Sequence, residues 1–436
     1  IKTLPSHLIS LEIAIFMARV AIIGSGISGL GAARFLYQTY DISLFEKQTR
    51  LGGHTHTHDL SIGETRVAVD TGFIVHNKAN YPNLVRLFEE LNIETCDSNM
   101  SFSVDRRGVS DGLSWCSRGL NGVFTERKNI WDPRFYRFLY QIHRFNKVGN
   151  HFLYENDAQK AALTLQDFLN QHDLDDTFAE NYIYPMASSV WSMSRQHMKD
   201  FPVLTLLRFF QNHGMLGMTT QYGWRTIQGG TSRYIAPLVE PFKNQIFLNR
   251  TPIRIQRQVD RVDLFFADGT LQSFDHVVLA CPAPDALNLL SDPSDREREI
   301  LSAFEVSQNP TILHRDRNLL PPQRRSWASW NYPVNPEGGP VRLTYHMNRL
   351  QPLATREDLF VTLNAESHID PALIERRMDY VHPKYNERSI EAQHRWSEIS
   401  SVDRRTHFAG AYWNYGFHED GLVSGLRVAR ALGAKW

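Results

Sequence analysis

Apolar and polar residues follow a recognisable order from residue 19 onward. Residues 20–23 form an unbroken apolar run, which is typical of a strand buried on both faces of a parallel sheet. Leu30, Ala33 and Leu36 then recur with helical spacing, and Ile42, Leu44 and Phe45 indicate the next strand. The pattern predicts strand, helix and strand, the opening of an α/β fold with a parallel sheet.

Two later segments have a similar pattern. Residues 261–274 predict a hairpin that turns at Asp268-Gly269, and residues 277–280 predict a buried strand that returns to the first sheet. Further along, a short strand is expected to end at Phe408, followed by a glycine turn and a helix beginning near Gly421.

The intervening segments have a different pattern. Helical spacing predicts helices over residues 81–91, 132–152 and 165–172. Between residues 287 and 393, strands are expected at 341–346 and 359–363, and a helix is expected around 371–381.

Three glycines stand between the first predicted strand and helix. Gly24, Gly26 and Gly29 have the spacing G-x-G-x-x-G, in which the first glycine permits a tight turn and the second lets a pyrophosphate approach. The third lets the helix pack closely on the strand. Glu46 follows Gly26 by 20 residues, where a carboxylate binds a ribose 2′-hydroxyl. These residues predict a site for a dinucleotide without a 2′-phosphate.

Composition and charge exclude several classes of protein. The 436 residues include 47 Lys+Arg and 47 Asp+Glu, so the overall charge gives no indication of binding to nucleic acid or to anionic lipid, both of which need clustered positive charge. Cys96, Cys116 and Cys281 are too few and too far apart for a disulfide framework or a thiolate zinc site, and we predict a cytoplasmic protein. The apolar stretch over residues 8–16 is interrupted by Glu12 and is too short to span a membrane, and residues 1–16 are interpreted as an upstream extension.

Four segments together resemble the FAD-binding flavoproteins of the amine oxidase, phytoene desaturase and protoporphyrinogen oxidase superfamily. They are the glycine motif with Glu46, residues 50–53, Gly229-Gly230 and residues 408–423. More narrowly, ASWNY, LTYHMNRLQPL and GFHEDGLVSG are similar to predicted NAD/FAD-binding proteins often encoded beside cyclopropane-fatty-acid synthases, which implies a role in lipid metabolism.

The resemblance implies a discontinuous Rossmann-like FAD-binding domain, with a parallel sheet and a β-hairpin or meander. An α+β substrate domain is interleaved with it. We assign residues 17–80, 225–286 and 394–436 to the FAD-binding domain, and residues 81–224 and 287–393 to the substrate domain.

The family's binding roles carry over to matching positions. The resemblance implies pyrophosphate contacts near the first motif, ribose contacts beside Glu46, phosphate or flavin contacts after it, adenine packing at Ile253, and ribityl-phosphate or pyrimidine contacts in the late block. The residues concerned are Gly24, Ser25, Gly26, Ile27, Ser28, Gly29, Glu46, Lys47, Arg50, Gly52, Gly53, His54, Ile253, Gly410, Ala411, Gly421, Leu422 and Val423. Many relatives have an acidic residue where this chain has Ala411, which removes one expected contact. Because no cysteine follows Cys281, we predict noncovalent FAD.

Most candidates for catalysis lie within residues 408–423. His418 is the first candidate because it lies three residues before Gly421, and Trp413 and Tyr415 would complete an aromatic wall. His314 is a second candidate for proton transfer. The run His54, His56 and His58 would place three imidazoles on one face of a strand, but it directly follows the predicted flavin contacts, and we predict no metal site.

We therefore expect an FAD-dependent oxidoreductase, similar to amine oxidases, that dehydrogenates an apolar substrate by hydride transfer to flavin. The substrate classes are a lipid or fatty-acyl compound, an amine or a terpenoid; frequent aromatic residues between the nucleotide segments favour an apolar substrate. A redox-neutral fatty-acid isomerase is one alternative. A noncatalytic FAD-binding partner of a lipid-modifying enzyme is another, and it predicts that replacing Gly26 abolishes folding. Peripheral membrane contact and oligomeric state are left open.

Overall fold

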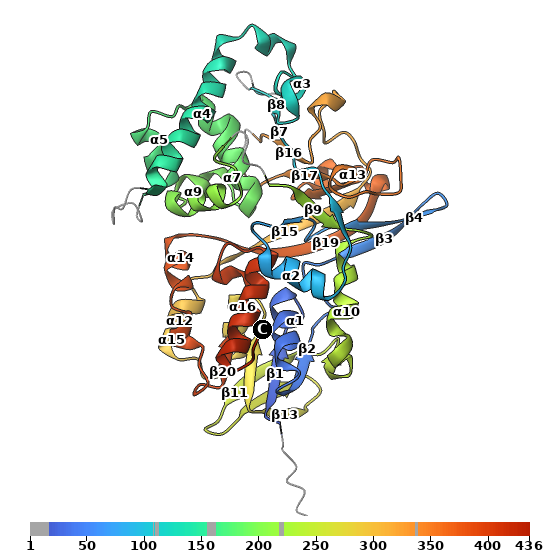
Figure 1. Cartoon of the computed structure of the whole chain (residues 1–436), viewed down its shortest axis with the longest axis vertical. Helices are drawn as coiled ribbons and strands as arrows, with labels where there is room; N and C mark the ends of the chain where they lie inside the picture. Colours follow the sequence, from blue (N-terminus) through green and yellow to red (C-terminus); the bar gives the residue numbers. More distant parts are fainter. Residues whose placement is uncertain (1–16, 108, 110–112, 155–162, 218–221, 336–338) are drawn as a thin grey trace, which may run out of the picture.

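The computed structural model describes residues 17–107, 109, 113–154, 163–217, 222–335 and 339–436. The molecule is elongated, with a nucleotide-binding lobe at one end and a helical insertion at the other (Figure 1). The predicted upstream extension, residues 1–16, lies outside the described residues.

A parallel five-stranded sheet forms the centre of the nucleotide-binding lobe. Its strand order is β10-β2-β1-β14-β20, and β1 pairs with β2 on one side and with β14 on the other. The strands come from distant parts of the chain, which confirms the predicted return to the first sheet. Their bounds are β1 Arg19–Ile23, β2 Asp41–Phe45, β10 Ile246–Phe247, β14 His276–Leu279 and β20 Thr406–Phe408.

The predicted hairpin is present as part of a three-stranded antiparallel sheet. It consists of β11 (Pro252–Arg257), β12 (Val262–Phe266) and β13 (Leu271–Phe274). Phe266 and Phe274 lie 5.1 and 6.0 Å from the ring of Phe45, so the hairpin buries one face against β2. Burial of such aromatic rings is a large part of what holds two layers together.

Helix α16 (His418–Ala431) lies beside α1 (Ile27–Leu36), although the two are almost 400 residues apart (Figure 1). Small residues permit the close approach: a methyl group on Gly425 would lie 2.3 Å from the carbonyl oxygen of Ser28. Leu422 reaches across onto Gly31. The helix predicted near Gly421 begins three residues earlier, at His418.

Helix α2 (Pro82–Glu90) covers this pair. Leu84, Leu87 and Phe88 belong to the same hydrophobic cluster as α1 and α16, although the predicted boundaries assign α2 to the substrate domain. The Glu419 carboxylate accepts hydrogen bonds from the backbone N–H groups of Asn83 and Leu84, at 3.0 and 2.9 Å, and so caps the beginning of α2.

A mixed seven-stranded sheet separates the nucleotide-binding lobe from the helical insertion. Its order is β19-β15-β18-β17-β16-β7-β8, and only the β16–β7 pair is parallel. The helix expected around residues 371–381 is wrong, because these residues enter β19, which pairs antiparallel with β15 along its length. The strand bounds are β7 Phe102–Asp105, β8 Trp115–Cys116, β15 Val306–His314, β16 Trp330–Pro333, β17 Leu343–His346, β18 Phe360–Leu363 and β19 Ile374–Pro383.

Helices α3 to α9 form the insertion, and its aromatic residues are mostly core. Trp191, Phe209 and Phe210 pack in one buried cluster with several phenylalanines. The predicted helices are confirmed in α2, α4 and α5. Bounds are α3 Gly119–Val123, α4 Pro133–Tyr154, α5 Leu165–Gln171, α6 Asp176–Phe178, α7 Tyr184–Trp191, α8 Arg195–Lys199 and α9 Val203–Asn212.

Smaller elements join these parts. No helix in the described ranges is long and apolar enough to cross a membrane. The remaining bounds are β3 Thr57–Ile62, β4 Thr65–Asp70, β5 His76–Asn77, β6 Thr95–Asp97, β9 Trp224–Ile227, α10 Ile235–Val239, α11 Ala283–Leu289, α12 Asp295–Leu301, α13 Met347–Leu350, α14 Glu387–Gln393 and α15 Trp396–Ile399.

Candidate functional site

The three motif glycines have different surroundings. A Cβ on Gly24 would lie 2.6 Å from the carbonyl oxygen of Ala280, and one on Gly29 would lie 1.9 Å from that of Gly24. Gly26 instead has no described atom within 4 Å of where its Cβ would stand. Gly24 and Gly29 are therefore required for packing, whereas Gly26 leaves open space at the beginning of α1.

That space lies at a helix N-terminus suited to phosphate. Gly26 is the N-cap of α1 and supplies no side-chain hydrogen bond, and the first turn contains no acidic residue. Ile27 and Ser28 are the first residues of the helix, and their side chains are buried. No side-chain cap hydrogen bond is present at this end of the helix. Such a terminus attracts a pyrophosphate through its N–H groups and its dipole.

Glu46 ends β2 beside this turn. Its carboxylate accepts hydrogen bonds from the N–H and hydroxyl of Ser25, at 2.9 and 2.6 Å, and from the N–H of Gln48 at 2.8 Å. These bonds fix the carboxylate next to the glycine motif, as a ribose-binding role requires. Lys47 points elsewhere and forms a surface ion pair with Asp285 at 3.7 Å.

The segment after Glu46 lies against the glycine motif. The N–H of Gly52 donates to the carbonyl oxygen of Ser25 at 3.0 Å, and a Cβ on Gly53 would lie 3.1 Å from the Cα of Gly26. The Arg50 guanidinium donates to the carbonyl oxygen of Gly53 at 2.8 Å. Burial lowers the pKa of Arg50. The arginine thus holds the loop in shape and brings positive charge to the predicted pyrophosphate site.

His54 is half-buried, and its Nε2 atom is buried without a hydrogen-bond partner among the described residues. Its ring lies 5.1 Å from that of Tyr380 and 5.4 Å from that of His382, and burial lowers its pKa to about 4. An orphaned buried nitrogen beside Gly53 is available to a ligand. His56 and His58 have rings 3.9 Å apart, but within the described ranges no group of three or more His, Cys, Asp or Glu is arranged to hold a metal ion.

Residues 408–423, the late block, lie against α1 and the glycine motif. The N–H of Gly410 donates to the hydroxyl of Ser424 at 3.0 Å, which ties the turn to α16, and Ala411 begins a short 3-10 turn, residues Ala411–Trp413. Gly421 faces α1, where a Cβ would lie 2.6 Å from Ile27, so its observed role is helix packing.

Leu422 is buried, whereas Val423 is partly exposed. The Ile253 side chain is mostly exposed at a register shift in β11, so the implied adenine contact rests on its backbone. Taken together, the open face of Gly26, the uncapped α1, the placed Glu46 and the orphaned His54 nitrogen fit a dinucleotide such as FAD.

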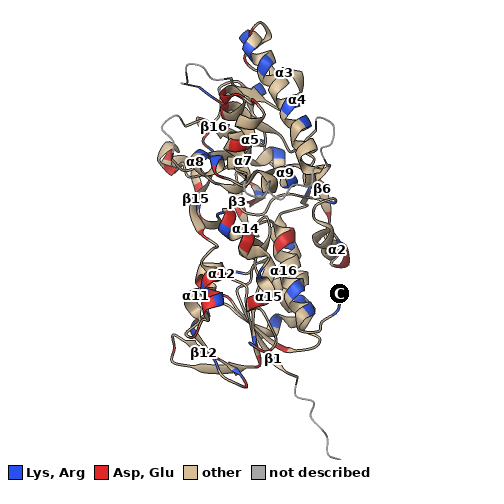
Figure 2. Cartoon of the chain, turned by 90° about the vertical axis from the view of Figure 1, so that its left-hand side faces the viewer, with Lys and Arg blue, Asp and Glu red and all other residues tan. Residues whose placement is uncertain are grey.

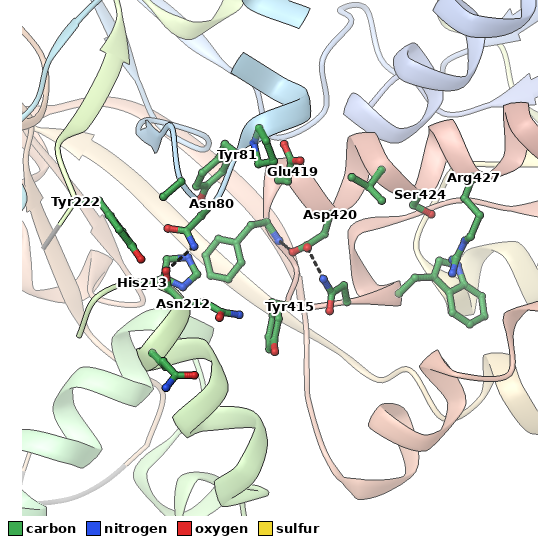
Figure 3. Close-up of a pocket in the computed structure, with 17 residues that line it drawn as sticks. Asn80, Tyr81, Asn212, His213, Tyr222, Tyr415, Glu419, Asp420, Ser424 and Arg427 are labelled. Atoms are coloured by element: carbon green, nitrogen blue, oxygen red, sulfur yellow. Dashed lines mark hydrogen bonds between the residues drawn. The ribbon is translucent and has the colours of Figure 1, made fainter. Parts of the chain in front are cut away.

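A cavity of about 580 Å³ lies beside the beginning of α16 (Figure 3). The ends of α9 and the beginning of α2 form its other walls. Its lining is Ala79, Asn80, Tyr81, Pro82, Gln211, Asn212, His213, Tyr222, Trp413, Asn414, Tyr415, Phe417, Glu419, Asp420, Val423, Ser424 and Arg427. The predicted wall residues Trp413 and Tyr415 are both among them.

His418 does not line this cavity. It is buried, its ring stacks on Phe73 at 3.8 Å, and its Nε2 forms a 2.8 Å hydrogen bond with the hydroxyl of Thr55. Burial lowers its pKa to about 3, so the imidazole is neutral. His418 therefore joins α16 to the loop after Gly53 and does not face the cavity as expected.

His314 is also removed from the cavity. It lies fully buried in β15, where its Nε2 bonds the hydroxyl of Thr362 at 2.7 Å and its Nδ1 accepts from the N–H of Asp316 at 3.1 Å. Burial lowers its pKa to about 4. With both nitrogens occupied, it has the environment of a structural histidine.

Sequence reasoning missed the three charged residues of the cavity, Glu419, Asp420 and Arg427. Asp420 accepts hydrogen bonds from the N–H of Phe417 at 2.8 Å and from the amide of Asn414 at 2.7 Å, and burial raises its pKa to about 7. Arg427 lies seven residues, about two helical turns, further along α16. The only sequence signal is this i, i+7 spacing, which depends on knowing where the helix begins.

Comparisons with known proteins agree with this geometry. The sequence profile of a family described as flavin containing amine oxidoreductase matches residues 27–312. No curated protein matches the chain.

Solved structures show the same fold. The chain resembles a CLA-producing fatty acid isomerase from P. acnes (17% identity, TM-score 0.66). It also resembles a putrescine oxidase variant (13%, 0.67) and cyclohexylamine oxidase from Brevibacterium oxydans IH-35A (14%, 0.66). Each likeness covers 95% of this chain and 98% of the other.

The profile match covers more than half of the chain and confirms the predicted family and cofactor. The structural likenesses confirm the predicted fold. The chain belongs to the flavin-containing amine oxidoreductase family and is an FAD-dependent oxidoreductase.

Proposed function

We propose that this oxidoreductase dehydrogenates an apolar substrate with an acidic head group, a fatty-acyl compound, in the cavity beside α16. The observation that carries the proposal is the guanidinium of Arg427, which lines the cavity and forms no ion pair with a carboxylate of the described residues. A cation without a counter-ion in a partly apolar cavity favours an anionic ligand.

The surroundings of Arg427 support this role. Its Nε and Nη2 atoms are buried and have no hydrogen-bond partner among the described residues. The guanidinium lies over Trp396 and Trp413, 4.3 and 5.5 Å from their ring centroids, which holds it in place and only partly replaces its lost hydration. Burial lowers its pKa to about 10, so it is protonated at neutral pH.

The acidic residues of the cavity do not offset this charge. Glu419 is occupied by the N–H groups that begin α2. Asp420 is partly protonated near neutral pH, because burial raises its pKa to about 7. The unpaired Arg427 therefore favours an acid over a cationic amine.

The shape of the cavity supports an extended substrate. Phe417 and Arg427 are ten residues apart on α16, a distance of about 15 Å along the helix axis. Val423 and the aromatic rings of Trp413 and Tyr415 line the space between its ends. An acyl chain can lie along this wall with its carboxylate at Arg427.

FAD held beside Gly26, Glu46 and Arg50 would supply the two-electron acceptor for a hydride from one substrate carbon. Dehydrogenation also releases a proton from the adjacent carbon, and the two broken C–H bonds leave a C=C bond. Asp420 lines the cavity and has a pKa near neutrality, so its carboxylate is suited to take that proton.

Anaerobic titration tests the proposal. Purified protein should show flavin absorbance near about 375 and 450 nm, and noncovalent FAD should be released on denaturation. Fatty acids, fatty amines and terpenoids are then added in turn; we expect only the acids to bleach the 450 nm band.

Replacement of the guanidinium provides the matched comparison. Arg427→Gln should raise the half-saturating acid concentration by about tenfold or more, because a charge-assisted hydrogen bond is lost. Arg430→Gln, an exposed arginine on the same helix, should leave it unchanged. Bleaching by amines alone, or equal titrations for both variants, would contradict the acidic head group.

A redox-neutral isomerase of unsaturated acids is the second candidate. The likeness of fold to the fatty acid isomerase favours it, and it would use the same carboxylate anchor. It predicts a product of unchanged mass without oxygen uptake, whereas dehydrogenation removes two hydrogens.

A further inference from the structure

Large apolar side chains are exposed at the far end of the helical insertion. Trp131 and Leu120 are 86% and 78% exposed, and Tyr136, Tyr140 and Ile130 are also exposed. We call these five residues the tip patch. Exposed apolar groups gathered on one surface mark an interaction site more often than scattered ones.

The patch belongs to one continuous surface. The hydroxyl of Tyr136 donates to the carbonyl oxygen of Ile130 at 2.9 Å, and the Phe124 ring lies 6.1 Å from that of Tyr136. Arg127 donates to the carbonyl oxygen of Phe124 at 3.0 Å and also bonds Asn121. These contacts join α3, the 3-10 turn Arg127–Ile130 and the beginning of α4.

Basic residues surround the patch. Residues 118–147 contain seven Lys or Arg and two Asp or Glu, in a chain whose formal net charge is zero. Surface ion pairs join Lys128 to Glu126, Arg134 to Asp132, Arg137 to Asp175 and Arg144 to Asp173. Three of the seven basic residues exceed these four carboxylates, so a positive excess is left. In Figure 2, blue segments of the ribbon mark Lys and Arg along α3 and α4 at one end of the molecule. The seven are Arg118, Arg127, Lys128, Arg134, Arg137, Arg144 and Lys147.

We propose that the tip patch docks onto an anionic lipid surface. Trp131 and Leu120 would enter the boundary between head groups and acyl chains, where tryptophan and tyrosine are favoured. The basic residues around them complement anionic head groups. The nucleotide-binding lobe lies at the opposite end of the long axis, so this orientation keeps it in water (Figure 1).

Vesicle binding tests the proposal without requiring a substrate. Full-length protein with its flavin is sedimented with vesicles of phosphatidylcholine alone and of phosphatidylcholine with phosphatidylserine in equal parts. We expect binding to the mixed vesicles, weak binding to phosphatidylcholine alone, and release at high salt, because screening weakens the attraction of exposed charges.

Three variants separate the apolar and the electrostatic contributions to vesicle binding. Leu120→Ser combined with Trp131→Ser should lower partitioning by at least about tenfold, since two apolar side chains no longer leave water. Lys128→Glu combined with Arg134→Glu should abolish the preference for phosphatidylserine. Val259→Ser is the matched control, because Val259 is 98% exposed on a turn of the nucleotide-binding lobe.

Every replaced side chain is exposed, and the ion pairs that Lys128 and Arg134 would lose lie at the surface. Flavin absorbance should therefore not change, and the melting temperature should change little. The proposal is overturned if the wild type does not bind the mixed vesicles, as an acidic protein partner for this face would predict. It is also overturned if binding is equal without phosphatidylserine, or if the Leu120/Trp131 double variant binds as the Val259 variant does.

Discussion

Replacing Gly26 and Gly29 separately distinguishes cofactor binding from folding. Gly26 has φ −63° and ψ 173°, an ordinary extended conformation, and nothing described lies within 4 Å of an added Cβ. Gly26→Ala therefore introduces neither backbone strain nor an overlap. We expect its free energy of unfolding, measured without flavin, to change by no more than about 1 kcal/mol. The added methyl group would nevertheless occupy the space assigned to the pyrophosphate.

Gly29→Ala should have the opposite effect. Its Cβ would lie 1.9 Å from the carbonyl oxygen of Gly24 and 3.2 Å from the Cβ of Ala280. A normal contact would require α1 to move away from the sheet by about 1.5 Å. Overpacking of this size, against backbone, costs about 3 kcal/mol or more.

Two measurements separate these effects. The ratio of flavin to protein absorbance should fall close to zero for Gly26→Ala, while its melting temperature should match that of flavin-stripped wild type and not rise with added FAD. Gly29→Ala should melt well below stripped wild type. A Gly26→Ala protein with one FAD per chain would refute the assignment of this space to the pyrophosphate, and one that does not fold would refute the packing argument. The open space beside Gly26 favours a folded Gly26→Ala protein, in contrast to the expectation from the noncatalytic alternative that replacing Gly26 abolishes folding.

Three further substitutions address the titratable groups. Because burial raises the pKa of Asp420 to about 7, kcat/KM of wild type should rise with pH through that value, whereas Asp420→Asn should give a low, flat pH profile. His314→Gln should lower the melting temperature and leave kcat/KM within about twofold, since its hydrogen bonds lie wholly within the sheet. Burial raises the pKa of Asp70 to about 6, so folding favours the protonated form of this carboxyl. The stability that this form contributes is complete below about pH 4 and is lost as the pH rises through 6. Between these pH values the melting temperature of wild type should therefore fall relative to that of Asp70→Asn.

The nucleotide-binding lobe could be predicted because its signals are local. A buried strand, a glycine turn and a helix follow one another within residues 19–36, and Glu46 ends the next strand. Strand β19 could not be predicted in the same way. Ile374, Met378 and Val381 are spaced four and three residues apart, as on a helix, and pairing with β15, about 70 residues away, decides the outcome.

The cavity depends on a boundary that sequence patterns do not fix. With a helix predicted to begin near Gly421, Asp420 stands outside it, and the face that it shares with Arg427 cannot be recognised. Histidine is a common proton-transfer residue, and His418 and His314 were therefore candidates for catalysis. Their surroundings are set by residues distant in sequence: Thr55 and Phe73 contact His418, and Thr362 contacts His314. Tertiary contacts therefore decided which titratable groups reach the cavity.

The contact between α1 and α16 affects the order of events during protein synthesis. A nascent chain exposes the glycine motif early, but β20 is complete only when translation has passed residue 408 and α16 only when it has passed residue 431. Until then Gly31 and Ser28 lack the surface of α16 that packs on them, and one edge of the parallel sheet is unpaired. The helical insertion, built from a contiguous segment, can fold first. Stable capture of FAD is therefore expected to follow synthesis of α16, and a ribosome stalled before it would carry an exposed sheet edge that is prone to aggregation.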